Sequence, residues 1–275
     1  MVRAADGTLR VDGATIHFKT AGRGPVLLLL PGGDGDADAF DLSLPDLSDR
    51  FQVVICDRRG LARSGLDDPQ QEMTIERHAD DAHAVLGAVT DGPALVFGGS
   101  LGAVVALDLA VRHPESTRAV IAFEPPLPGL LPDAQRDAAH AACEIVQAAL
   151  MAGGPFPAMR QFSQMAGVNA IDSEAGVPIA SPQRAANFIS FLTRDAPAVW
   201  HYHLDLSRLA PLSDRIVPAA GINSADAWPH RAASALADAL GRPLVRFAGD
   251  HAGFVRHPRS FAARCRDLFS PYLSS

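Results

Sequence analysis

Short apolar runs recur along the chain, separated by polar or turn-forming residues. Val26–Leu30 is apolar throughout, which is typical of a strand covered on both faces of a parallel sheet. Similar runs occupy residues 51–56, 94–98, 118–123, 215–220 and 243–249. Near the N-terminus, residues 9–18 have strand character on both sides of Asp12-Gly13, a dipeptide suited to a tight turn. The pattern predicts a hairpin followed by several buried strands.

Helical patterns lie between several of these runs, at residues 74–89, 101–113 and 229–240. The last has Pro229 near its start and Gly241 just past its end, as expected for a helix. Alternating strands and helices predict an α/β fold, with a mostly parallel central sheet and helices on both faces.

One interval, residues 125–212, contains no convincing strand. Its pattern predicts helices at 133–151, 158–166 and 182–194, and another near Trp200. We therefore expect a helical cap inserted at 125–212 into a core made of residues 1–124 and 213–275.

Composition excludes several classes of protein. The 275 residues include 24 basic and 31 acidic ones, a net charge of −7 that disfavours nucleic acid as a partner. Three cysteines are too few for a disulfide framework or a zinc site. The chain starts without the apolar core of a signal peptide, and Val26–Leu30, its longest aliphatic run, is far short of the about 20 residues that span a bilayer. We expect a cytoplasmic protein with a small-molecule substrate and no membrane partner, and the chain is compatible with a homodimer.

The strongest chemical signal is Gly98-Gly99-Ser100-Leu101-Gly102. This G-x-S-x-G motif directly follows one predicted strand and opens a predicted helix, a setting that exposes a serine hydroxyl in a sharp turn. Small residues are needed two positions before and after the serine, because larger ones would collide in that turn. Ser100 is the candidate nucleophile.

A serine nucleophile needs a base that takes its proton. Of the ten histidines, His251 lies in the loop after the last predicted strand. Such loops, at the carboxyl ends of parallel strands, are where these sheets gather their chemistry. His251 is therefore the candidate base.

Four segments together resemble the α/β-hydrolase fold family over nearly the whole chain: LLLLPGGDG (27–35), CDRRGLARSG (56–65), GGSLG (98–102) and GDHAGF (249–254). The resemblance implies Ser100 as nucleophile and His251 as general base, then acid. It also implies an oxyanion hole from the backbone N–H groups of Leu101 and Gly33, which stabilise charge on the carbonyl oxygen during attack. Pro31 stands where the family often has histidine, so the second donor is Gly33 or Asp34.

The acid that orients His251 is the least clear member. In most of the family it follows the strand that here is 215–220, where Asn223 holds the aligned turn and Asp226 comes slightly later. Glu124 instead follows the neighbouring strand and precedes Pro125-Pro126, which restrict the backbone. Lactonases acting on resorcylic macrolactones look similar here. We predict Glu124 as the acid, and we assign Asp226 to capping the helix that follows.

The early loop contains Asp34, Asp36 and Asp38 at alternate positions. A calcium loop would need glycine at its sixth position and glutamate at its twelfth, where this chain has Ala39 and Pro45. We therefore predict no metal site.

Together these residues predict a cofactor-independent serine hydrolase that cleaves an ester or lactone of a small, mainly apolar molecule. Family members that open epoxides or displace halide use aspartate at the elbow. The alternatives are a carbon–carbon bond hydrolase or thioesterase on the same residues, and a non-hydrolytic ligand-binding member of the fold.

The cap would supply an apolar pocket. Its candidate lining is Leu130, Phe156, Met159, Phe162, Met165, Phe188, Phe191, Leu192, Trp200 and Tyr202. From these we single out Phe156, Met159, Phe188 and Trp200, together with Asp34 of the early loop.

Overall fold

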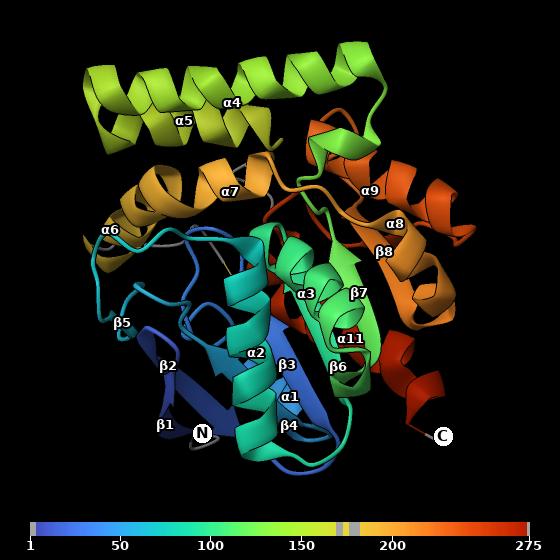
Figure 1. Ribbon diagram of the computed structural model, residues 1–275. Coiled ribbons are helices and arrows are strands. Elements are labelled where there is room, and N and C mark those ends of the chain that lie inside the picture. Colours follow the sequence, from blue (N-terminus) through green and yellow to red (C-terminus); the bar gives the residue numbers. More distant parts are fainter. Residues whose placement is uncertain (1–3, 169–172, 176–181, 274–275) are drawn as a thin grey trace.

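A computed structural model describes residues 4–168, 173–175 and 182–273. In this part of the chain, nine strands form one twisted sheet (Figure 1). They are β1 (Ala5–Val11), β2 (Ala14–Ala21), β3 (Val26–Leu30), β4 (Gln52–Cys56), β5 (Gly65–Leu66), β6 (Ala94–Gly99), β7 (Thr117–Phe123), β8 (Ile216–Gly221) and β9 (Val245–Phe247). The order in the sheet is β1-β2-β4-β3-β6-β7-β8-β9, with the short β5 pairing with β2.

The central part of the sheet is parallel. Strands β4, β3, β6, β7, β8 and β9 pair in parallel in that order. Strands β1 and β2 form an antiparallel hairpin whose turn, Asp12-Gly13, has glycine at φ 72°, a left-handed conformation that suits glycine. The mostly parallel sheet and the N-terminal hairpin are both confirmed.

Helices cover both faces of the sheet. The helices are α1 (Leu44–Ser48), α2 (Ile75–Val89), α3 (Leu101–Arg112), α4 (Asp133–Gly153), α5 (Pro155–Met165), α6 (Pro182–Ser190), α7 (Ala196–Trp200), α8 (Leu206–Leu209), α9 (Trp228–Leu240), α10 (Gly253–Arg256) and α11 (Pro258–Phe269). The predicted helices at 74–89, 101–113 and 229–240 correspond to α2, α3 and α9.

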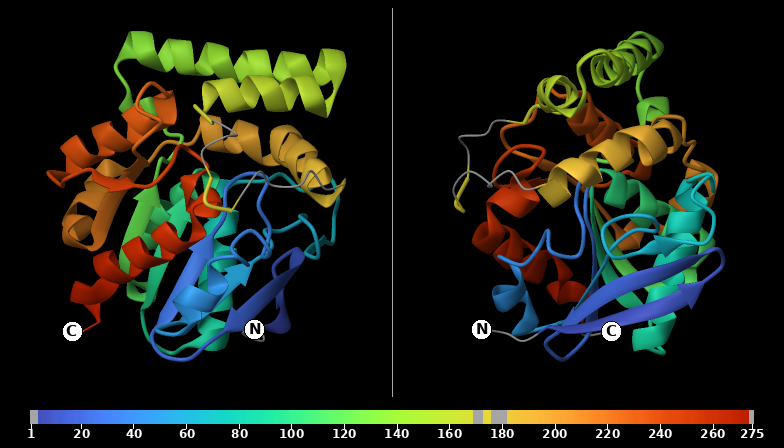
Figure 2. Two further views of the ribbon diagram at one scale, coloured as in Figure 1. Left: turned by 180° about the vertical axis from the view of Figure 1, so that it is seen from behind. Right: turned by 90° about the vertical axis from the view of Figure 1, so that its left-hand side faces the viewer.

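Successive residues of one strand enter opposite cores, because strand side chains alternate. Leu28 and Leu30 of β3 pack in one apolar cluster with buried residues of α2, α3 and α9. Leu27 and Leu29 pack in the other, with residues of α1 and α11. The views in Figure 2 show α11 and α1 on the face away from α2 and α3. This double coverage explains the uninterrupted apolar run at 26–30.

Between β7 and β8, the described residues form helices and turns but no strand. We call residues 125–212 the cap segment. Figure 1 shows α4 to α7 of this segment above the sheet, at the edge where β6 and β7 end. The carboxyl ends of the parallel strands therefore lie beneath the cap segment.

The predicted helix at 182–194 is interrupted. Helix α6 ends at Ser190, a π-helical turn follows at Phe191–Asp195, and α7 then begins. Pro197 is the second residue of α7 and has no N–H to donate, so a regular helix cannot continue through this point. The π-helical turn places Phe191 against Gly33 and Asp195 against Arg58, in the loops that follow β3 and β4.

The short helices α1, α8 and α10 and the C-terminal α11 lie outside the predicted helices. In the described part of the chain, every helix is too short or too polar to cross a membrane.

Candidate active site

Ser100 lies in a sharp turn between β6 and α3. Its backbone has φ 54° and ψ −121°, a strained conformation for a non-glycine residue, and its N–H donates to the Phe123 carbonyl oxygen at 2.9 Å. A Cβ atom at Gly98 would overlap the Gly102 carbonyl oxygen, and one at Gly102 would overlap the Leu30 carbonyl oxygen. The turn therefore requires glycine at both positions, which is the physical basis of the motif.

His251 approaches Ser100 from the loop between β9 and α10. Its Nε2 lies 3.0 Å from the Ser100 Oγ, and both residues are almost fully buried. The main chain around Gly249 and Asp250 leads into this loop. It packs so closely on Gly221 that a side chain there would contact both carbonyl oxygens. The end of β8 thus fixes where the histidine loop runs.

Glu124 is the carboxylate that meets His251. It directly follows β7, has φ 45°, and its N–H donates to the Ala219 carbonyl oxygen at 2.9 Å. Its Oε2 accepts a hydrogen bond from the His251 Nδ1 at 2.6 Å. Because this bond uses the Nδ1 hydrogen, the Nε2 of neutral His251 is the acceptor for the Ser100 hydroxyl.

The two alternative residues do not take this position, because the Glu124 carboxylate already binds the His251 Nδ1. Asn223 and Asp226 are both exposed, in the turn after β8. Asp226 also does not cap α9, since the N-cap residue is Ala227 and no side chain caps that end. The capping role expected for Asp226 is wrong. The helix begins one residue later, and the Asp226 backbone carbonyl accepts a hydrogen bond from Arg231.

Glu124 is fully buried but stays ionised because donors surround it. Its Oε1 accepts from the Gly221 N–H at 2.8 Å and from the Ser224 hydroxyl, and the His230 Nδ1 lies 3.5 Å away. Burial alone would raise the Glu124 pKa. The hydrogen bonds from His230, His251 and Ser224 more than offset it and lower the pKa from 4.5 to about 2.

The loop expected to form the oxyanion hole lies beside Ser100, since a Cβ on Gly32 would be 3.5 Å from the Ser100 Cβ. Leu101 is the first residue of α3, where N–H groups have no partner within the helix. Among the described residues, neither the Leu101 nor the Gly33 N–H donates to a backbone carbonyl outside regular helices and strands. The absence of such a backbone bond is compatible with the predicted role of both groups as oxyanion donors.

Arg58 holds this loop from behind. Its guanidinium donates to the carbonyl oxygens of Gly32 at 2.9 Å and Gly33 at 2.6 Å. In a trans peptide the C=O and N–H groups point in opposite directions, so fixing the Gly32 carbonyl turns the Gly33 N–H away from Arg58. The side chain therefore sets the orientation of the predicted oxyanion donor.

Arg58 is in turn paired with the cap segment. Its Nη2 lies 3.3 Å from the Asp195 Oδ2, and the His78 Nε2 of α2 donates to the Asp195 Oδ1 at 3.0 Å. All three side chains are buried. Burial raises the Asp195 pKa, but the Arg58 charge and the His78 hydrogen bond leave it below its usual value. Sequence reasoning missed this group, although Arg58 lies in one of the segments that carry the family resemblance.

Asp34, the other candidate donor and pocket residue, contacts the cap segment through its side chain and its carbonyl oxygen. Its Oδ2 accepts from the Arg184 Nε at 2.7 Å, and its carbonyl oxygen accepts from the Asn187 side chain at 3.3 Å. Asn187 also donates to the Asp36 carboxylate at 2.9 Å, and Asp38 pairs with Lys19. The three acidic side chains of this loop therefore have cationic or amide partners.

Aromatic side chains of the cap segment cover the loop. A Cβ on Gly33 would lie 2.5 Å from the Phe191 ring, which shows how closely that ring packs on the predicted oxyanion loop. Phe191 neighbours Trp200 and Phe188, with ring centroids 6.5 Å and 6.4 Å away, and both are buried. Met159 packs partly buried against the same apolar cluster.

Phe156 is wrong as a pocket residue, because its side chain is 73% exposed. It lies two positions before Ala158, the fully buried residue of α5. Two positions correspond to about 200° around a helix, so Phe156 points away from the buried face.

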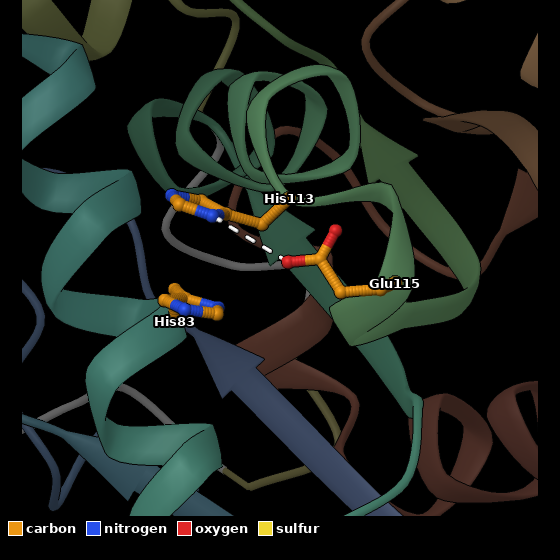
Figure 3. A group of neighbouring side chains, drawn as sticks. All are labelled: His83, His113 and Glu115. Atoms are coloured by element: carbon orange, nitrogen blue, oxygen red, sulfur yellow. Dashed lines mark ion pairs between the residues drawn. The ribbon is translucent and has the colours of Figure 1, made fainter.

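A group of potential metal ligands lies near the C-terminal end of α3, whereas Ser100 lies at the N-terminal end of this helix. Among the described residues, His83, His113 and Glu115 bring ligand atoms within 4.8 Å of one another (Figure 3). The two imidazoles are stacked, with centroids 3.9 Å apart and planes 7° from parallel. Ring-nitrogen lone pairs lie in the ring planes, so two parallel stacked rings do not direct them at a common ion. His83 Nδ1 is also bonded to Ser116 and His113 Nε2 to Asp80.

Comparisons with known proteins agree with this architecture. A family model described as the alpha/beta hydrolase fold matches residues 25–155. Over 267 residues the chain is 34% identical to the "Uncharacterized hydrolase YraK" of Bacillus subtilis (strain 168), covering 96% of this chain and 95% of that protein. Over 118 residues it is 30% identical to the zearalenone hydrolase of Bionectria ochroleuca, covering 42% of this chain and 45% of that protein. A thermophilic esterase structure from Thermogutta terrifontis matches with TM-score 0.73 at 18% identity, covering 98% of this chain and 99% of that one.

The chain belongs to the α/β-hydrolase fold family. It is a hydrolase of this family, and the relative that aligns over almost the whole chain is itself named a hydrolase.

Proposed function

We propose that the protein is a serine hydrolase that cleaves a carboxylic ester or lactone through an acyl-enzyme on Ser100. The observation that carries this proposal is the continuous hydrogen-bonded chain from the Ser100 Oγ through His251 to Glu124. A serine next to a base that a buried carboxylate orients is the arrangement that nucleophilic acyl transfer needs.

In the proposed reaction, the Ser100 Oγ attacks the substrate carbonyl carbon while the His251 Nε2 takes the hydroxyl proton. The resulting oxyanion is bound by the Leu101 and Gly33 N–H groups, which Arg58 and the helix start hold ready. His251 then gives the proton to the leaving alkoxide, and the acyl-enzyme forms. A water molecule, deprotonated by the same Nε2, attacks the acyl carbon, and the carboxylate product leaves as Ser100 regains its proton. Glu124 stabilises the imidazolium at both stages.

The nucleophile narrows the class of bond. Family members that open epoxides carry aspartate at the elbow, whereas this chain has Ser100 there. The proposed reaction needs no cofactor, because Ser100, His251 and two backbone donors are sufficient for every step.

The substrate we propose is small and mainly apolar, and the cap segment encloses it. Ser100 is only 7% exposed, and Phe191 and its aromatic neighbours lie over the loop beside it. These rings favour an apolar group next to the reacting carbonyl.

The test is hydrolysis of a panel of 4-nitrophenyl esters of increasing acyl length, aromatic lactones, thioesters and 1,3-diketones, with intact-protein mass spectrometry. We expect ester or lactone turnover and an acyl mass increment on Ser100 when deacylation is slow. Turnover of the thioesters or diketones alone would favour those chemistries instead. Tight binding of panel members without turnover or labelling of Ser100 by a fluorophosphonate would favour the ligand-binding alternative.

A further inference from the structure

A second histidine lies on the far side of Glu124 from His251. His230, in the first turn of α9, is buried, and its Nδ1 lies 3.2 Å from the Ser224 Oγ and 3.5 Å from the Glu124 Oε1. Sequence reasoning did not single it out, because nothing local distinguishes it from a core histidine. Its other ring nitrogen, Nε2, lies 2.7 Å from the Arg246 Nη1 of β9.

Arg246 determines which ring nitrogen of neutral His230 carries the hydrogen. A guanidinium has donors only, so the Nε2 of His230 must accept, and the ring hydrogen of the neutral imidazole is then on Nδ1. The Nδ1–H therefore points toward Ser224 and Glu124. The Ser224 hydroxyl makes its closest contact with the Glu124 Oε1 and donates its single hydrogen there. The hydrogen bonds of this network therefore run in one direction, from the Arg246 guanidinium through His230 and Ser224 to the Glu124 carboxylate.

This hydrogen-bond network gives the two carboxylate oxygens of Glu124 different partners. Oε1 faces the Gly221 N–H, the Ser224 hydroxyl and the His230 Nδ1–H, whereas Oε2 faces His251. Glutamate has three rotatable side-chain bonds, so a carboxylate held only by His251 could rotate. The donors on Oε1 remove that freedom and direct Oε2 at the His251 ring.

We propose that His230 is a positioning residue of the active site, which holds Glu124 for His251 in a tautomer that Arg246 sets. The proposal rests on the proposed function, in which Glu124 orients the general base. It goes further by assigning a role to a residue that touches neither the substrate nor Ser100.

Two variants of His230 separate this role from simple packing. His230→Phe keeps a ring and removes both nitrogens, whereas His230→Asn keeps an N–H donor close to the position of Nδ1. The first readout is the rate at which a fluorophosphonate labels Ser100. We expect His230→Phe to slow labelling on the order of 10- to 100-fold, the effect of losing one hydrogen bond to a charged group. His230→Asn should recover most of the loss, and esterase assays should show the change in kcat rather than KM.

Arg246 offers a test that does not disturb the core, because it is an exposed residue. Arg246→Met should slow labelling, since the His230 hydrogen is then free to move to Nε2, and Arg246→Lys should retain the wild-type rate. Arg23→Met, at an exposed arginine in the turn after β2, is the matched control and should label at the wild-type rate.

The downfield proton resonance of the His251–Glu124 hydrogen bond is the second readout. It should be present in the wild type, lost in His230→Phe and kept in His230→Asn. Wild-type labelling in folded His230→Phe and Arg246→Met, with the resonance intact, would overturn the positioning role. If the wild type itself is not labelled, the proposed function fails, and the resonance alone decides whether His230 holds Glu124.

Discussion

The Asp195 carboxylate of the cap segment lies 3.3 Å from the Arg58 guanidinium, which binds the carbonyl groups of the loop beside Ser100. The two residues are 137 positions apart and both are buried. His78 holds the second carboxylate oxygen at 3.0 Å. One residue of the cap segment thus contributes to the orientation of the Gly33 N–H.

Asp195→Ala is therefore expected to lower kcat, although the substitution replaces no residue that we expect to contact the substrate. Without its carboxylate, Arg58 is buried and unpaired, and the loop it holds loses its fixed orientation. We expect kcat to fall about 10- to 100-fold with little change in KM, because the oxyanion donors act mainly in the transition state. Urea unfolding should also show a loss of about 3–5 kcal/mol from the unpaired buried charge.

Asp137→Ala, at an exposed carboxylate of α4, is the matched control and should change neither quantity. An Asp195→Ala protein with wild-type kcat would show that Arg58 orients the loop without the cap segment.

The sequence predicts those parts of the site that depend on local structure. The elbow around Ser100 follows from a strand, two glycines and a helix within one short segment. Glu124 follows from the end of its strand and from the prolines behind it. In both cases the neighbouring residues impose the conformation, so the pattern along the chain carries the information.

The parts that the sequence could not predict depend on contacts between distant segments. His230 meets Glu124 across 106 positions, and Asp195 meets Arg58 across 137. Nothing in the residues around His230 or Asp195 distinguishes them from other buried polar groups. The error at Phe156 has a different origin, because the direction in which a helix face points depends on how the helix docks.

Ser100→Ala tests the nucleophile directly. The substitution removes the attacking oxygen but no core volume, so the fold and its Tm should be unchanged. We expect kcat to fall on the order of 10⁴-fold or more, as when the nucleophile of such a triad is removed. Activity within tenfold of the wild type in a pure sample would contradict the serine mechanism.

Glu124→Gln and Asp226→Asn test the identity of the acid. Glutamine preserves the shape of Glu124 but cannot stabilise the His251 imidazolium, so acylation should slow by about three to four orders of magnitude. Asp226 is exposed and lies outside the hydrogen-bonded chain, so Asp226→Asn should cost less than tenfold. The rate of fluorophosphonate labelling reports the same His251-assisted attack by the Ser100 Oγ, and circular dichroism is the check on folding. The reverse pattern would restore the family's commoner arrangement.

Chelation tests the expectation that catalysis needs no metal. EDTA should leave kcat unchanged, because the proposed mechanism uses only side chains and backbone donors. Zinc added to the chelated protein should not raise its Tm, since the stacked rings of His83 and His113 do not converge on one ion. A zinc-dependent rise in Tm that disappears in His113→Ala would show that the rings rearrange around a metal.

The lowered pKa of Glu124 makes a prediction about stability and pH. The pKa falls from 4.5 to about 2 in the folded protein, because donors on both carboxylate oxygens outweigh the burial that would raise it. A carboxylate with a depressed folded-state pKa stabilises the fold above its unfolded value, and this contribution is lost as the pH falls through the folded value. The contribution of Glu124 is therefore complete above about pH 5 and is lost progressively between about pH 4.5 and 2. Its size is on the order of 3 kcal/mol. Urea unfolding between pH 7 and pH 3 should show a smaller decline in the free energy of unfolding for Glu124→Gln than for the wild type. Asp226→Asn should follow the wild type, and a Glu124→Gln curve parallel to the wild type would show that Glu124 titrates alike in both states.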